Sequence, residues 1–158
     1  VYPGATEYCD GVQNDCSNSA WVNDDGRATF ITTAGVMSDA TVKLSGGTST
    51  SPKAVTMSAS GELDVCGGTW YVALRVTAGS LKIHGFTGGS TVVLSGAKAS
   101  SVITVPQASN VEIRDLDITE GKGCYGSGIA LASVSSCTSS SASAGLPVVN
   151  LDLYNVNL

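Results

Sequence analysis

Residues 111–118, VEIRDLDI, determine our interpretation of the fold because their pattern occurs three times. They align with LKIHGFTG from residue 81 and with LDLYNVNL from residue 151. Apolar residues take the first, third and sixth positions in each copy, so two alternating strands are joined by one extra residue that shifts the inward phase. The extra position holds residue types that best tolerate a left-handed backbone. They are Gly85, Asp115 and Asn155. The pattern predicts a bend with positive φ at each of them.

The three copies are separated by 30 residues (111 minus 81) and 40 residues (151 minus 111). Repeats of about 20–45 residues are typical of solenoids, in which each coil lies on the one before it. The sequence therefore predicts an all-β chain folded as a right-handed parallel β-helix. A hairpin meander would not reproduce the same bend in every third strand, and a β-sandwich remains the alternative.

The composition agrees with a β-rich, exported domain. Of the 158 residues 6% are aromatic and 13% are charged, and 19 are glycines that suit tight turns. Nucleic-acid binding needs a basic face, which a net charge of −5 disfavours, so we expect no nucleic-acid partner. Apolar runs stay well below the roughly 18 residues that a membrane span needs, so we expect no membrane insertion.

We divide the chain into three parts. Residues 1–26 form an N-terminal motif, residues 27–65 form strands that cap the β-helix, and residues 66–158 form its coils. A cap is expected because an uncovered terminal coil is a sheet edge ready to pair with another chain. A serine-rich insertion at residues 124–147 interrupts the coils.

The chain contains five cysteines, which in a polar, acidic sequence indicate disulfides and therefore export. The spacing predicts two local disulfides, Cys9–Cys16 and Cys124–Cys137. Cys66 is then left over, as a buried thiol or as half of a bond to another chain.

The opening stretch VYPGATEYCDGVQNDC resembles the MopE-type metal-binding motif of secreted bacterial surface proteins. VYPGATE, CDGV and NDC stand in the order of that family, and CGGTWYVALRV from Cys66 resembles the start of the right-handed parallel β-helix regions that often follow such motifs. The resemblance implies calcium binding, export and a role at the cell surface or in a matrix. The calcium ligands it implies, carried over by position, are Asp10, Asn14, Asp15, Asp24 and Asp25.

The motif departs from the family pattern in ways that remove oxygen ligands. The upstream acidic cluster is absent, Gln13 stands where the family prefers aspartate, and SNSAWVN replaces a short Asp-Gly link. Calcium prefers about 6–8 oxygen ligands. The alternative for this stretch is a disulfide turn whose Asp and Asn side chains cap backbone groups and clasp the cap.

The repeat also predicts outward columns of polar side chains. One column contains Lys82, Glu112 and Asp152, and the next contains His84, Arg114 and Tyr154. Carbohydrate-active β-helix proteins place carboxylates and a basic residue on such a face, so the first column is a candidate sugar-contact face. The simpler interpretation is a solvated face with a weak Lys82–Glu112 ion pair. We expect His84 to be solvated, and no motif predicts a catalytic residue.

We predict a non-enzymatic protein, exported to the cell surface or beyond, with a structural or adhesive role. The last segment, LDLYNVNL, forms an apolar strand edge that predicts either a continuing chain or a second copy stacked on it. End-to-end stacking of such copies would build a fibre. The alternative is a carbohydrate-binding or carbohydrate-cleaving, pectate-lyase-like β-helix domain, acting as a polysaccharide lyase or glycoside hydrolase.

Overall fold

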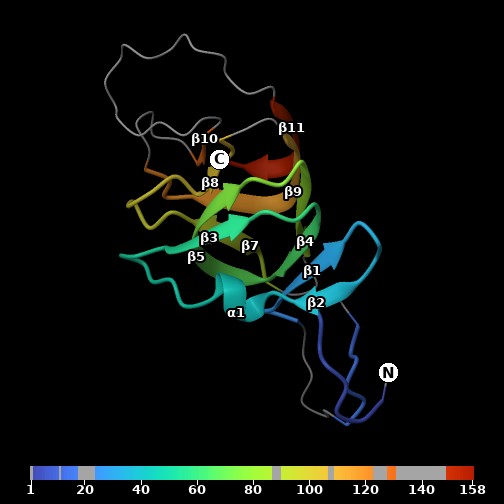
Figure 1. Ribbon diagram of the computed structural model, residues 1–158. Coiled ribbons are helices and arrows are strands. Elements are labelled where there is room, and N and C mark those ends of the chain that lie inside the picture. Colours follow the sequence, from blue (N-terminus) through green and yellow to red (C-terminus); the bar gives the residue numbers. More distant parts are fainter. Residues whose placement is uncertain are drawn as a thin grey trace, which may run out of the picture.

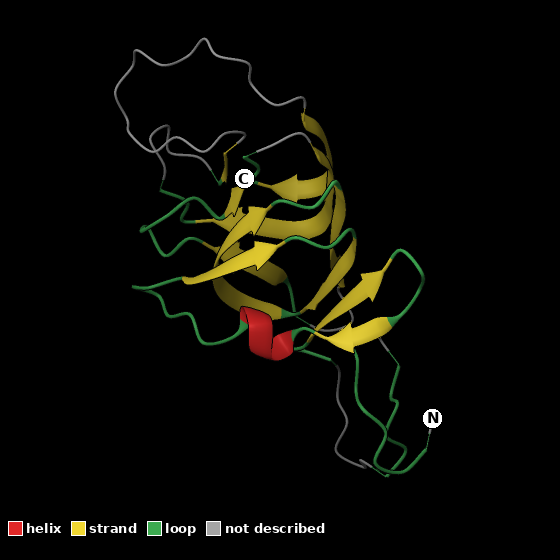
Figure 2. Cartoon of the chain, in the orientation of Figure 1, coloured by secondary structure: helices red, strands yellow, loops and turns green. Residues whose placement is uncertain are grey.

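The computed structural model describes residues 2–10, 12–17, 24–86, 90–106, 109–122, 128–130 and 149–158. These ranges are mostly β-strand, which confirms the predicted all-β class (Figures 1 and 2). The strands are β1 (Ala28–Thr32), β2 (Met37–Asp39), β3 (Lys53–Met57), β4 (Gly61–Cys66), β5 (Gly68–Val76), β6 (Ser80–Phe86), β7 (Val92–Ser95), β8 (Ile103–Thr104), β9 (Ser109–Thr119), β10 (Ile129–Ala130) and β11 (Val149–Asn157). A short helix, α1 (Thr41–Leu44), separates β2 from β3.

The eleven strands belong to one sheet, and the strands from β3 to β11 pair with one another in parallel. The pairings form three series: β4–β6–β9–β11, β5–β7–β9 and β3–β5–β8–β10. β5 and β9 take part in two series because each is long enough to contribute one half to each. The chain passes through the series in a fixed order, and each passage lies beside the previous one at the usual strand spacing of about 4.8 Å.

The residues that the sequence repeat aligns are paired in the structure. Val111 of β9 lies opposite Leu81 of β6 on one side and Leu151 of β11 on the other. β4 extends the same series, since its Leu63 pairs with Ile83. The repeat therefore predicts the register of the central series correctly.

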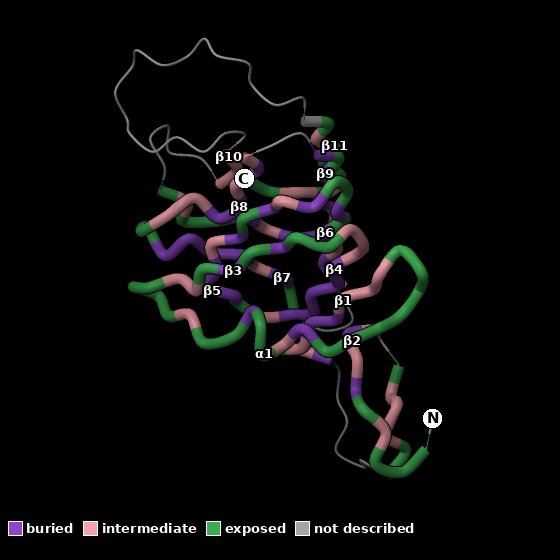
Figure 3. The backbone as a smooth tube through the Cα atoms, viewed as in Figure 1, coloured by how far each residue is buried: buried purple, intermediate pink, exposed green. Residues whose placement is uncertain are grey.

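The inward positions of this series form the core (Figure 3). Leu63, Ile83 and Ile113 follow one another across three strands, and each is 0% exposed. Burial of one such side chain contributes about 1.5–3 kcal/mol, so a continuous stack of them is the main source of stability. Other strands add core residues of the same kind, including Val72, Leu74, Leu94 and Ile103.

The predicted bend is confirmed at two of its three positions. Asp115 and Asn155 have φ values of 58° and 51°, in the left-handed region. Gly85 has no positive φ, so the prediction for it was wrong. Its lack of a side chain is needed for another reason: a Cβ there would lie 2.0 Å from the carbonyl oxygen of Asp115. The bend in β9 therefore packs its backbone directly onto β6.

We predict that Gly85→Ala lowers the free energy of unfolding by about 2–3 kcal/mol, because the added methyl group must push the β9 bend away. Gly79→Ala is the matched control, since a Cβ there comes no closer than 3.8 Å to its nearest neighbour, Ser60 Oγ. Urea unfolding of both variants checks this expectation. Equal losses in the two variants would contradict the close approach.

One end of the sheet is covered by the segment that precedes β3. β1 pairs antiparallel with β4, β2 pairs antiparallel with β1, and Leu44 of α1 is 1% exposed (Figure 1). This segment occupies the place of the predicted cap. Parallel pairing already begins at β3 and β4, which lie within residues 27–65.

The structure pairs Cys9 with Cys66, so the predicted Cys9–Cys16 disulfide is wrong. The two Cα atoms are 5.6 Å apart, and Cys9 is fully buried with its N–H donating to Thr29 Oγ1 at 2.8 Å. Cys16 is a free, exposed thiol. The residue expected to be left over is therefore the one that ties the N-terminal segment to β4.

A carboxylate binds the loop between the two neighbouring cysteines. Glu7 accepts hydrogen bonds from the backbone N–H groups of Asn14 and Asp15, at 2.9 and 2.5 Å. The returning part of the loop is thereby held beside Glu7, while Cys16 faces solvent. A sequence spacing alone carries no information about such a contact.

We predict that the double variant Cys9→Ala/Cys66→Ala loses about 4 kcal/mol of unfolding free energy, as expected for a bond that closes a 57-residue loop. Cys16→Ser should change it by less than about 0.5 kcal/mol, because its thiol is exposed and free. Urea unfolding under non-reducing conditions measures both. A large loss of unfolding free energy in Cys16→Ser would indicate that Cys9 pairs with Cys16 instead.

The predicted Cys124–Cys137 bond lies outside the described residues. None of the helices in the described ranges is long and apolar enough to cross a membrane.

Candidate functional site

The outer face of β4, β6 and β9 carries two columns of charged side chains. They alternate with the buried positions of the core, so they point away from it. The first column contains Glu62, Lys82, Glu112 and, on β11, Asp152. The second contains Asp64, His84, Arg114 and, on β11, Tyr154.

The residues of the predicted sugar-contact face do share one column. Lys82 pairs with Glu112, and Glu112 pairs with Asp152. Lys82 and Asp152 are exposed and Glu112 is half-buried, so the column is open to solvent. Its contact with sugar stays a prediction.

Three potential metal ligands meet where the two columns lie side by side. One comes from the first column and two come from the second. One donor atom each from Glu62, Asp64 and His84 lies within 4.8 Å of the other two, and this β4–β6 cluster could hold a metal ion. His84 Nδ1 is 3.4 Å from Asp64 Oδ1 and 3.7 Å from Glu62 Oε1. Glu62 and Asp64 project from the same side of β4 because they are two residues apart on one strand.

Arg114 lies against this cluster from β9. One terminal guanidinium nitrogen is 3.3 Å from His84 Nδ1 and 3.5 Å from Glu62 Oε1. A guanidinium can only donate, so Nδ1 of His84 accepts and carries no proton in this arrangement. The Nε atom of Arg114 is buried and has no hydrogen-bond partner.

The pKa of His84 lies below its usual value. Burial is the largest cause, and the positive charge of Arg114 adds to it, while Glu62, Asp115 and Glu112 oppose it. The imidazole is therefore neutral at pH 7. The expectation of a solvated His84 was wrong, since its side chain is only 18% exposed. Its second nitrogen, Nε2, lies 3.6 Å from Asp115 Oδ2.

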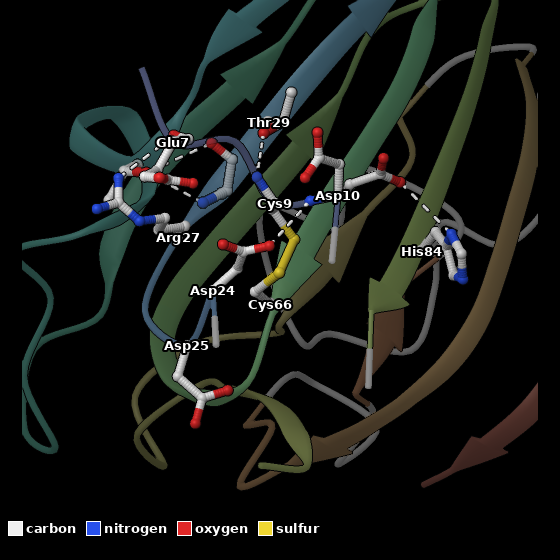
Figure 4. Close-up of a disulfide and its surroundings, with 12 residues drawn as sticks. Glu7, Cys9, Asp10, Asp24, Asp25, Arg27, Thr29, Cys66 and His84 are labelled. Carbon is white, nitrogen blue, oxygen red and sulfur yellow. Dashed lines mark hydrogen bonds and ion pairs between the residues drawn. A yellow bond between two sulfur atoms is a disulfide. The ribbon is translucent and has the colours of Figure 1, made fainter. Parts of the chain in front are cut away.

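Asp64 is the most buried member of the cluster, at 7% exposed. Its Oδ1 accepts no hydrogen bond. Its strand partner in β1 is Thr29, whose hydroxyl accepts the N–H of Cys9 (Figure 4). The disulfide-bound N-terminal segment is near enough for the charge of Asp10 to act on Asp64. Burial, then the charge of Glu62, raises the pKa of Asp64 to about 7; Arg114 lowers it and Asp10 raises it further.

The sequence contained a signal for this cluster that the repeat did not reveal. GELDVC from Gly61 aligns with LKIHGF from Leu81, twenty positions on, and this alignment is the pairing of β4 with β6. β4 lacks the bend residue that identified the other copies, since Val65 occupies the position of Gly85. The three-copy pattern therefore left Glu62 and Asp64 out.

Two of the calcium ligands implied by the resemblance, Asp10 and Asn14, contact each other, while Asp15 makes its own set of hydrogen bonds. Asp10 accepts hydrogen bonds from the N–H of Val12 at 2.9 Å and from Asn14 Nδ2 at 3.2 Å. Asp15 accepts from the N–H groups of Gly4 and Ser17 and from the Ser17 hydroxyl, and these bonds lower its pKa, the hydroxyl most.

Of the two remaining aspartates, Asp24 lies beside Asp10 and Asp25 contacts a different segment. Asp24 is 3% exposed and accepts the N–H of Asp10 at 3.3 Å, while Asp25 binds Ser90, whose hydroxyl donates at 2.7 Å (Figure 4). Within the described ranges, the group of three donors that meet within 4.8 Å includes none of these aspartates. Calcium binding by them stays a prediction.

The comparisons with known proteins add no family. Neither models of known protein families, nor curated proteins, nor solved structures gave a match to this chain.

We predict that Asp64 lowers the free energy of unfolding in a pH-dependent way. The raised pKa means that the folded chain holds a proton that the unfolded chain releases above about pH 4, so stability from this group is lost as the pH rises from about 4 to about 7. In EDTA, Asp64→Asn should gain roughly 2–4 kcal/mol over the natural chain at pH 8 and nothing at pH 4. Urea unfolding at both pH values measures this, and a gain that does not change with pH would contradict it.

Proposed function

We propose that this chain is a right-handed parallel β-helix of an exported surface or matrix protein, with a structural or adhesive role and no catalytic one. The fixed order in which the chain passes through three series of parallel strands is the observation that carries the proposal. Strand–crossover–strand connections are overwhelmingly right-handed, and this is the basis for the proposed hand.

Polar ladders between β9 and β11 support the structural role. Three asparagine side chains of β11 each donate to the residue at the equivalent place on β9, at 2.6–3.0 Å. The pairs are Asn150–Asn110, Asn155–Asp115 and Asn157–Asp117. Ladders of this kind are typical of stacked, in-register strands. Their outward polar groups stabilise the stack itself.

The N-terminal segment supports both export and a clasp. A buried disulfide such as Cys9–Cys66 persists in oxidising compartments and is rare elsewhere. Arg27 also reaches the segment, since its guanidinium donates to the carbonyl oxygen of Glu7 at 3.3 Å. We therefore propose that the MopE-like stretch fastens the cap to β4, and that calcium, if bound there, would be additional to this clasp.

For self-association we propose a contact between the β11 edges of two copies. Among the described strands β11 pairs with β9 alone, and its Leu153 and Tyr154 are 40% and 57% exposed. An end-to-end fibre needs two open ends, whereas α1, β1 and β2 cover the other end. A two-fold contact between β11 strands closes on itself and gives a dimer.

Sedimentation velocity over a wide concentration range tests this contact. We expect a monomer–dimer equilibrium that Tyr154→Lys weakens. Val42→Lys is the matched control, because Val42 is 78% exposed on α1 at the covered end. Loss of association in both variants would indicate end-to-end stacking instead, and a natural chain that stays monomeric at every concentration would refute self-association.

The alternative function is carbohydrate binding or cleavage. The specific observation in its favour is the β4–β6 cluster with Arg114, which places carboxylates and a cation beside the Lys82 column. A screen of acidic polysaccharides for new reducing ends or unsaturated products separates the two functions. The structural proposal predicts no turnover. Turnover that Glu112→Gln and Asp152→Asn both abolish would establish the enzyme instead.

A further inference from the structure

We propose that Glu62, Asp64 and His84 form a binding site for one divalent transition-metal ion of the zinc class, and that the Arg114 guanidinium occupies it when the metal is absent. The inference concerns a different surface from the proposed assembly contact and does not depend on the structural role. Its ligands come from two neighbouring strands, β4 and β6.

The distances are close to those of a metal site. In a tetrahedral zinc site with bonds of about 2.0–2.1 Å, neighbouring ligand atoms are about 3.4 Å apart. His84 Nδ1 lies 3.4 Å from Asp64 Oδ1 and 3.7 Å from Glu62 Oε1. The third separation, between the donor oxygens of Glu62 and Asp64, is within 4.8 Å, so the three donors lie close enough together to bind one ion.

The environment of Asp64 is an independent indication of a missing cation. The side chain of Asp64 is only 10% exposed, and Oδ1, the atom that faces His84, accepts no hydrogen bond. Buried polar atoms without partners are rare in folded proteins, because desolvation is not repaid. A metal ion bound at Oδ1 would supply the partner that the protein does not.

The donor set favours zinc over calcium. Two carboxylates and one neutral imidazole are common zinc ligands, and they leave a fourth position open to water. Calcium requires about 6–8 oxygen ligands and seldom uses nitrogen. The side chains of Glu62 and His84 are 29% and 18% exposed, so an ion and a water molecule can reach the site from solvent.

The strands also hold the ligands in place. β4 is paired on both sides, with β1 and with β6, and its last residue, Cys66, is fixed by the disulfide. Ligands on a rigid scaffold lose little freedom on binding, which favours affinity. Asp115 Oδ2, 3.6 Å from Nε2, is placed to orient the imidazole from its other side.

Arg114 makes the proposal sharply testable. Its contacts with His84 and Glu62 are long, at 3.3 and 3.5 Å, and its Nε is buried without a partner. The guanidinium therefore competes with a metal for the same lone pair of Nδ1. If the cluster is a metal site, removal of Arg114 should strengthen metal binding. If the cluster is only an ion-pair network, removal of Arg114 should weaken that network and leave metal binding unimproved.

The experiment is calorimetric titration of the EDTA-treated full chain with Zn²⁺, in a Cys16→Ser background so that the exposed thiol cannot bind the metal. We expect one equivalent with micromolar affinity, at least tenfold weaker binding in Asp64→Asn and in His84→Gln, and about tenfold tighter binding in Arg114→Gln. Glu112→Gln is the matched control on the same face, and it should bind as the parent does.

Co²⁺ absorption provides a second readout, because a tetrahedral site with one nitrogen ligand gives intense visible bands that free Co²⁺ lacks. Circular dichroism and urea unfolding establish that each variant is folded before titration. Three results would overturn the proposal: no zinc binding in either the parent or Arg114→Gln, binding in Asp64→Asn and His84→Gln that is as tight as in the parent, or binding of Ca²⁺ in preference to Zn²⁺.

Discussion

In-register pairing of parallel strands is the constraint on which the rest of this structure depends. Each passage of the chain satisfies its backbone hydrogen bonds on the previous passage, so equivalent residues lie about 4.8 Å apart. Inside the sheet this places Leu63, Ile83 and Ile113 in one buried row. The same pairing forces side chains on the outside to stand in columns, whatever their charge.

The columns explain the electrostatics of the candidate site. Lys82 stands between Glu62 and Glu112, which suits a column of alternating charge. Asp64 on β4 has Thr29 on β1 and His84 on β6 as its two strand neighbours. Neither of these neighbours carries a positive charge. Asp64 is a buried carboxylate, and its Oδ1 atom has no hydrogen-bond partner to offset the cost of burial.

The parts of the fold that follow from local pattern could be predicted from the sequence. Alternation with one extra residue predicted the all-β class, the register of β6, β9 and β11, and the left-handed bends at Asp115 and Asn155. Gly85 shows the limit of this reasoning. A glycine suggested a backbone with positive φ. The actual constraint is the carbonyl oxygen of Asp115 on the neighbouring strand, which leaves no room for a Cβ atom.

The site depended on contacts between distant segments and could not be predicted in the same way. The disulfide joins residues 57 positions apart, and the loop that leads to Cys16 is bound by Glu7 instead. The sequence repeat did not include Glu62 and Asp64, because β4 has no residue typical of the bend. The predicted column of Lys82 was placed correctly because it depends on register alone.

Disulfide trapping tests the stacked register most directly. Paired residues on adjacent strands have Cα atoms about 4.8 Å apart, within the range that a disulfide can bridge, whereas a shift of two residues along one strand gives roughly 8 Å. In the Cys16→Ser background, Lys82→Cys with Glu112→Cys should therefore cross-link on oxidation, and Lys82→Cys with Arg114→Cys should not. Peptide mapping by mass spectrometry identifies the bond. Equal trapping of both pairs, or trapping of the second pair alone, would contradict the register on which this account is built.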